Sequence, residues 1–157
     1  NLKNLYQILF RGKNNIECSP NSLNKTGFVK SEIVGGNLSI LYSLLGSKSD
    51  IKTDNKILFI EDLDEYLYHV DRMIISLKRA GKFNNIKAMI VGSMTKMHDN
   101  KIKFGMNAKE IIKYHTKEFN FPVCFNFPAG HQKNNRPVIL GKVSKLDINS
   151  NLVCLSQ

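Results

Sequence analysis

The sequence is poor in cysteine, and this scarcity limits the kinds of site that it can build. Its three cysteines, Cys18, Cys124 and Cys154, include no Cys-x-x-Cys pair. A disulfide framework needs paired cysteines, and a structural zinc site needs closely spaced ligands. The sequence therefore predicts neither, and it is compatible with a reducing compartment.

Long apolar segments and phosphate-binding glycine motifs are also missing. No apolar run approaches the roughly 18 residues that a membrane-spanning helix needs, and no signal-peptide pattern opens the chain. Without a P-loop or a Gly-x-Gly-x-x-Gly motif, no nucleotide cofactor is predicted. The first residue is Asn1 rather than Met. The chain therefore need not be the whole gene product, and a preceding segment would carry any targeting signal.

Arginine is scarce although the net charge is +10. Of the 23 basic residues, 19 are lysines and only 4 are arginines. Nucleic-acid recognition favours the arginine fork and a clustered basic surface, whereas these lysines are spread along the chain. The charge therefore does not predict a nucleic-acid partner.

The apolar residues that are present follow clear periodicities. With 157 residues, 42% hydrophobic and 23% charged, the chain is expected to form one globular domain. Helical spacing predicts helices at residues 2–10, 38–45, 65–80 and 107–119. Apolar or alternating segments predict strands at residues 15–18, 28–34, 56–61, 86–91 and 122–127, and a terminal hairpin from residues 138–146 and 152–155.

Glycines are expected to end two of these strands. Gly35-Gly36 would break the strand at residues 28–34, with Asn37 as a cap for the next helix. Gly92 would end the strand at residues 86–91, which leaves Ser93 in a loop. Strands alternating with helices over residues 56–127 predict an α/β fold with parallel βαβ core strands. Antiparallel strands from both ends of the chain would make the sheet mixed.

Polar residues follow two of the buried strands. Glu61 and Asp62 close the strand at residues 56–61, and His131 follows the apolar segment PVCFNFPAG. Functional side chains gather at the carboxyl ends of strands in such sheets, and a glutamate that orients a histidine is part of a catalytic triad. The alternative is that Asp62 or Asp64 caps the next helix and that His131 is an exposed loop residue. No Gly-x-Ser-x-Gly elbow supplies a nucleophile.

Other candidate site residues have simpler interpretations. His69, His98 and His115 show no metal-ligand spacing, so no metal site is predicted. Cys124 alternates within an apolar strand and is interpreted as a core residue.

Four segments together resemble a known family. In order, they are EIVGGNLSILYSLLGS, KILFIEDLDEYLYHVDRMIISLKRAGKF, IKAMIVGSM and FPVCFNFPAGHQKNNRPVILGKVSKL. This order is similar to the C-terminal domain of the LD-carboxypeptidase family, which includes murein tetrapeptide carboxypeptidases and microcin C immunity proteins. The resemblance covers about residues 25–146. It implies that residues 17–157 form this domain and that residues 1–16 are the tail of a missing N-terminal domain or a linker.

The resemblance also implies a reaction. Family members use a serine–glutamate–histidine triad to hydrolyse the L,D-peptide bond of peptidoglycan stem tetrapeptides, with release of D-alanine. Glu61 would be the triad glutamate and His131 the triad histidine. The serine and the oxyanion donors would belong to the N-terminal domain, so the isolated chain is expected to be inactive. No metal or organic cofactor is expected, and the full-length enzyme would act in the cytoplasm in cell-wall recycling.

Alternatives to this function remain open. One is a microcin-immunity-type serine peptidase that cleaves a peptide–nucleotide antibiotic, and another is a non-catalytic binding module of the same fold. The expected partners are the N-terminal domain and a peptidoglycan-derived peptide, without nucleic acid or membrane, and a homodimer is left open. The segment Leu63-Asp64-Glu65 departs from the family pattern of a proline or small residue, and its carboxylates are interpreted as helix caps.

Overall fold

The segments with strand-like patterns form a seven-stranded mixed sheet in the computed structural model, which describes residues 2–157. The strands are β1 (Asn15–Cys18), β2 (Gly27–Asn37), β3 (Ile57–Leu63), β4 (Ala88–Thr95), β5 (Val123–Cys124), β6 (Val143–Ile148) and β7 (Val153–Ser156). Their order across the sheet is β1-β7-β6-β2-β3-β4-β5. The strands β2, β3, β4 and β5 pair with one another in parallel. The strands β1, β7, β6 and β2 pair in that order as antiparallel neighbours. The predicted mixed α/β fold is confirmed.

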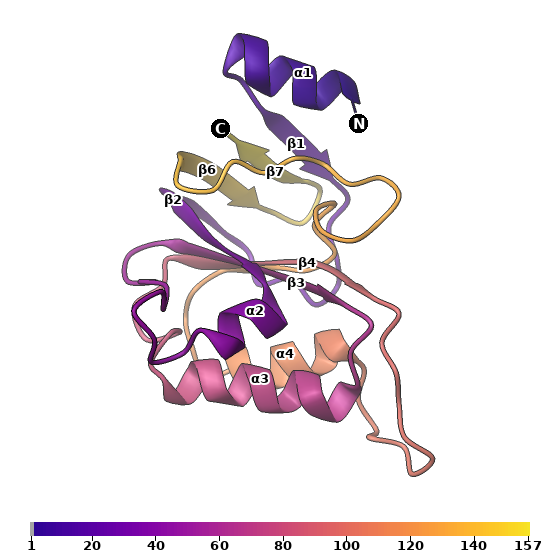
Figure 1. Ribbon diagram of the computed structural model, residues 1–157. Helices are drawn as coiled ribbons and strands as arrows, with labels where there is room; N and C mark the ends of the chain where they lie inside the picture. The colour runs from indigo at the N-terminus through magenta and orange to yellow at the C-terminus, as the bar shows by residue number, and fades with distance from the viewer. Residues whose placement is uncertain (1) are drawn as a thin grey trace.

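Three helices lie below the parallel strands in Figure 1, and the antiparallel strands lie above them. These helices are α2 (Leu38–Ser43), α3 (Leu67–Arg79) and α4 (Ala108–Thr116). Alternate residues of β3 divide between the two sides. Leu58 and Ile60 pack in the core between the sheet and the helices, whereas Ile57 and Phe59 pack in a second core with the antiparallel strands. The parallel strands are therefore buried on both faces, which explains their nearly continuous apolar sequence.

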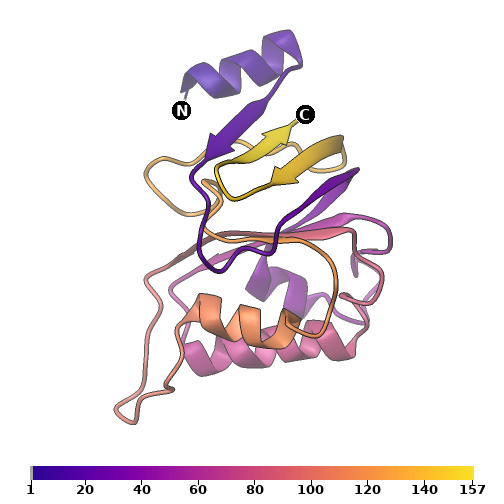
Figure 2. The same cartoon turned by 180° about the vertical axis from the view of Figure 1, so that it is seen from behind.

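The remaining helix, α1 (Leu2–Arg11), stands at the far end of the antiparallel strands (Figures 1 and 2). Its apolar side chains are largely exposed. No helix in residues 2–157 combines the length and apolar character needed to cross a bilayer.

The prediction that Gly35-Gly36 breaks its strand is wrong. β2 runs through both glycines to Asn37, and it changes partner along its length. Its first half pairs with β6, and residues 33–37 pair with β3. At Gly35, where φ is +133°, a Cβ would lie 1.9 Å from the Phe59 carbonyl oxygen. The glycine therefore lets the two strands approach closely instead of ending the strand.

Other strand boundaries also differ from those predicted. β4 continues through Gly92 to Thr95, so Ser93 lies in a strand and not in a loop. The third apolar segment forms a strand only at Val123–Cys124. In the terminal hairpin Asp147 and Ile148 belong to β6, because they still pair with β7.

α2 and α4 begin where asparagine side chains cap their first N–H groups. The Asn37 side chain accepts from the Ile40 N–H and caps α2, as predicted. Asn107 and Glu110 form a capping box at the start of α4. α3 begins only at Leu67, and its cap residue Tyr66 makes no side-chain capping bond.

Candidate active site

The candidate site begins at the carboxyl end of β3. Successive side chains of a strand point to opposite faces, so the neighbours Glu61 and Asp62 turn in opposite directions. Glu61 is on the face of Phe59, and Asp62 is on the helix face with Ile60. Both are buried, with relative exposures of 5% and 1%. Each carboxylate therefore needs partners of its own.

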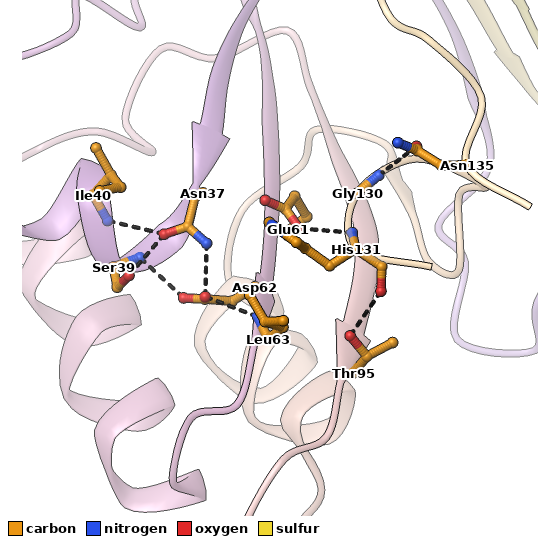
Figure 3. A network of polar contacts seen from close by, with 10 residues as sticks. All are labelled: Asn37, Ser39, Ile40, Glu61, Asp62, Leu63, Thr95, Gly130, His131 and Asn135. Carbon is orange, nitrogen blue, oxygen red and sulfur yellow. Dashed lines mark hydrogen bonds and ion pairs between the residues drawn. The ribbon is translucent and has the colours of Figure 1, made fainter. Parts of the chain in front are cut away.

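Asp62 binds the start of α2, the helix before β3 in the chain. Its carboxylate accepts from Asn37 Nδ2 at 2.7 Å, from the Ser39 N–H at 3.0 Å and from the Leu63 N–H at 2.9 Å (Figure 3). Burial raises the pKa of the Asp62 carboxyl group, and these three hydrogen bonds oppose that rise. Asp62 thus holds the β2–α2 turn against β3 and does not cap the helix that follows it.

His131 lies in the loop after β5, and this loop is fastened to β4. The Phe127 N–H donates to the Val91 carbonyl at 3.1 Å, and the Ser93 N–H donates to the Ala129 carbonyl at 2.9 Å. Thr95 Oγ1 donates to the His131 carbonyl at 2.9 Å. These three hydrogen bonds hold the loop alongside β4, so that His131 lies next to the end of β3.

Glu61 and His131 meet at this edge of the sheet. His131 Nδ1 donates to Glu61 Oε2 at 2.8 Å, and the His131 N–H donates to the same oxygen at 3.2 Å (Figure 3). The Glu61 side chain is 7% exposed and the His131 side chain 51% exposed. Within residues 2–157, His131 Nε2 makes no hydrogen bond. The ring is therefore held through Nδ1, while about half of the side chain is exposed.

Two glycines make room for the Glu61 side chain. A Cβ at Gly92 would lie 3.1 Å from Glu61 Cβ, and a Cβ at Gly130 would lie 2.9 Å from it. Gly130 also has a φ of +110°, a conformation that favours glycine. Because Gly130 has no side chain, the loop that carries His131 can pass directly over the Glu61 carboxylate.

The register of β3 and β4 shifts beside the site. Ile60 pairs with Val91, whereas Asp62 pairs with Met94, so β4 has one residue more than β3 across this step. Such a bulge turns one side chain of the longer strand to the face opposite the one that regular alternation would give it. Ser93 is the residue affected, and sequence reasoning missed it. An isolated glycine within an apolar strand, here Gly92, was the available signal.

The carboxylates after Asp62 do not cap α3 as expected. Asp64 binds His98 Nε2 at 2.6 Å, and Glu65 binds His69 Nδ1 at 2.7 Å. Asp64 has a φ of +63°, and neither carboxylate caps α3, whose cap residue Tyr66 makes no side-chain capping bond.

The other candidate side chains also have structural partners. His115 binds Asp71 at 2.6 Å. Cys124 is fully buried, and its contact with Cys18, together with burial, raises the pKa of its thiol, as expected for a core residue. Among the described residues, no three histidine, cysteine or carboxylate side chains are grouped closely enough to hold a metal ion.

The comparisons with known proteins agree with this fold. Residues 30–146 match the family model of the LD-carboxypeptidase C-terminal domain. The chain belongs to this family. Members of the LD-carboxypeptidase family are therefore the proteins against which its site is interpreted.

A curated relative carries a related name. The Bacillus subtilis (strain 168) protein "Probable murein peptide carboxypeptidase" is 33% identical over 125 residues, which are 80% of this chain and 39% of the relative.

Two solved structures share the fold. The muramoyltetrapeptide carboxypeptidase from Oxalobacter formigenes has a TM-score of 0.89 at 22% identity and covers 99% of this chain and 53% of its own. The microcin C7 self immunity protein MccF has a TM-score of 0.75 at 23% identity, over 92% of this chain and 41% of its own. This LD-carboxypeptidase domain thus spans about half, or less, of the proteins that it matches.

Proposed function

We propose that this chain supplies the glutamate and histidine of a serine-type LD-carboxypeptidase that removes the terminal D-amino acid from peptidoglycan-derived tetrapeptides. The observation that carries the proposal is the Glu61–His131 hydrogen bond through Nδ1. It fixes the ring as one tautomer and leaves Nε2 free for a nucleophile. The names of the relatives support the substrate class.

In this proposal each residue has one role. His131 Nε2 takes the proton of the attacking serine hydroxyl and gives it to the departing amine of the D-amino acid. It then takes a proton from the water that hydrolyses the acyl-serine ester and returns it to the serine oxygen. Glu61 remains ionised and stabilises the imidazolium that forms between these steps. The serine and the oxyanion donors come from an N-terminal domain, joined through the tail or linker expected at residues 1–16, of which residues 15 and 16 also pair with β7 as part of β1. The chain on its own is therefore inactive.

The proposed setting is cell-wall recycling in the cytoplasm. The free thiols of Cys18, Cys124 and Cys154 are compatible with a reducing compartment. The substrate is a small peptide, and the activity requires neither nucleic acid nor a membrane.

The test is D-alanine release from a stem tetrapeptide by the full-length protein, beside Glu61→Gln and His131→Ala. We expect the parent to cleave and each variant to lose at least about 1,000-fold in kcat/KM. The matched controls are Glu65→Gln and His69→Ala, which break a similar carboxylate–histidine pair at the start of α3 and should retain most of the activity.

Two outcomes would redirect the assignment. If the parent cleaves and the Glu61 and His131 variants keep most of their rate, the catalytic pair lies elsewhere. If the parent releases no D-alanine, a peptide–nucleotide substrate of the microcin-immunity type is tested next. Failure with both substrates would leave the non-catalytic binding module.

A further inference from the structure

Ser93 presents a buried hydroxyl group that lacks a partner. The residue is 7% exposed, and its Oγ is fully buried with no hydrogen bond to any described residue. Buried hydroxyl groups nearly always have a partner, and an exception needs an explanation. Ser93 is near Glu61 and takes no part in the mechanism described above.

The bulge in β4 brings this hydroxyl to the Glu61 side of the sheet. Val91 and Met94 pack toward the helices, and regular alternation would leave only one residue of the opposite face between them. The additional residue places both Gly92 and Ser93 opposite Glu61. A bulge beside a site commonly re-aims one side chain in this way.

The position of Gly130 shows how close the two groups are. A Cβ built on Gly130 would lie 2.5 Å from Ser93 Oγ and 2.7 Å from Glu61 Oε2. The hydroxyl and the carboxylate thus border the same small space, which the absence of a side chain at residue 130 keeps open. Glu61 Oε2 already accepts two hydrogen bonds from His131, and a carboxylate can accept more.

We propose that Ser93 is a positioning residue. In the assembled active site, its hydroxyl group donates a hydrogen bond to the Glu61 carboxylate across the small space that Gly130 keeps open. A small rotation about the Cα–Cβ bond, or one bridging water, completes the bond, and such contacts tighten when a catalytic site assembles. The added donor keeps the carboxylate turned toward His131 Nδ1. The inference rests on the proposed function for its catalytic consequence, but the bond itself can be measured in this chain.

The experiment follows the His131 Nδ1–H proton by nitrogen-15 NMR in this chain. Its exchange with water requires the Glu61–His131 bond to open, so the exchange rate reports how firmly the carboxylate is held. We expect Ser93→Ala to speed this exchange at least about tenfold, as loss of one hydrogen bond to a charged group implies. Ser93→Thr, which keeps the hydroxyl, should stay within about threefold of the parent.

Ser144→Ala is the matched control. Ser144 is also a buried strand serine, but its hydroxyl bonds Lys142 and Gln157, in the antiparallel part of the sheet. This variant should leave the His131 signal unchanged even if it lowers stability. An unchanged exchange rate in Ser93→Ala, or a Ser93→Thr rate as fast as that of Ser93→Ala, would overturn the proposal.

A second measurement separates this proposal from the proposed function. In the full-length protein, Ser93→Ala should lower kcat about tenfold with little change in KM, because substrate contacts are intact. If the parent does not cleave a tetrapeptide, the proposed function fails while the NMR result still decides the role of Ser93. If the parent shows no Nδ1–H signal, the Glu61–His131 arrangement itself is wrong.

Discussion

At the scale of single residues, Gly130 is the glycine that the candidate site itself requires. In Gly130→Ala the new Cβ would overlap Ser93 Oγ, Glu61 Oε2 and Glu61 Cβ, at distances of 2.5, 2.7 and 2.9 Å. We expect a loss of about 2–4 kcal/mol in the free energy of unfolding, from overpacking together with an unfavourable φ. Urea denaturation measures this loss.

Gly105 provides the control for this substitution. Its φ is +85°, and a Cβ there would meet nothing within 4 Å. Gly105→Ala should therefore cost only the conformational part, about 1 kcal/mol. Equal losses in the two variants would mean that the crowding at Gly130 is unimportant.

Asp50 gives the protein a pH dependence of known sign. Its carboxylate pairs with Lys82 Nζ at 2.8 Å, and this hydrogen bond lowers the pKa of the carboxyl group. A lowered pKa in the folded state stabilises the fold above the usual carboxyl range, and the stabilisation disappears as the pH falls through the folded-state pKa. We expect Asp50→Asn to cost about 0.5–1 kcal/mol at neutral pH and almost nothing in strong acid.

Unfolding of the parent and of Asp50→Asn, each measured in urea from pH 7 down to pH 2, checks this sign. A deficit of constant size over that range would show that the ion pair with Lys82 is not its source.

At the scale of elements, α3 and α4 are joined by a histidine–carboxylate contact in which the histidine is buried. His115 Nε2 lies 2.6 Å from Asp71 Oδ1, and the His115 side chain is only 8% exposed. Asp71→Ala leaves this ring buried without a partner, so we expect a loss of about 2–3 kcal/mol in unfolding free energy. Thermal and urea unfolding both report it.

The pair Glu65–His69 offers a matched comparison. It has a similar length, 2.7 Å, but joins residues four apart, with side chains 22% and 35% exposed. Glu65→Ala should cost less than about 0.5 kcal/mol. If Asp71→Ala and Glu65→Ala lower the free energy of unfolding by the same amount, the burial of His115 does not add to the loss in Asp71→Ala.

The elements also show what the sequence could and could not predict. Helical spacing of apolar residues located the helices, and continuous apolar runs located the parallel strands, because these strands are buried on both faces. Their ends were less predictable. Gly35-Gly36 resembled a break because the close approach of β3, which requires glycine there, is a contact distant in sequence.

For the candidate site, the sequence predicted which two side chains would meet, and their catalytic role stays a prediction. Residues at the carboxyl ends of two strands pointed to Glu61 and His131, and these side chains are in contact. The position of Ser93 depends on one additional residue in β4, and only the pairing with β3 reveals it. The histidine partners of Asp64 and Glu65 depend on a turn that periodicity does not describe.

At the scale of the whole molecule, α1 is unusual because it exposes several large apolar side chains. Its large apolar side chains are 43–83% exposed: Leu2, Leu5, Tyr6, Leu9 and Phe10. An apolar surface of this kind promotes association in water. We expect this chain on its own to self-associate, and sedimentation at increasing concentration measures this.

The double substitution Leu9→Glu with Phe10→Glu should shift the chain toward the monomer. Ile102→Glu is the control, because Ile102 is a single apolar residue, 89% exposed, outside the helices and strands. A parent that remains monomeric would show that α1 does not drive association.

The divided pairing of β2 also sets an order of events during synthesis. Its first half pairs with β6, which lies roughly 100 residues later, so this half waits about 5–20 s on a translating ribosome before its partner is made. Its second half pairs with β3, which emerges much sooner. The parallel half of the sheet can therefore assemble first, and until β6 is made the first half of β2 remains an unpaired strand edge.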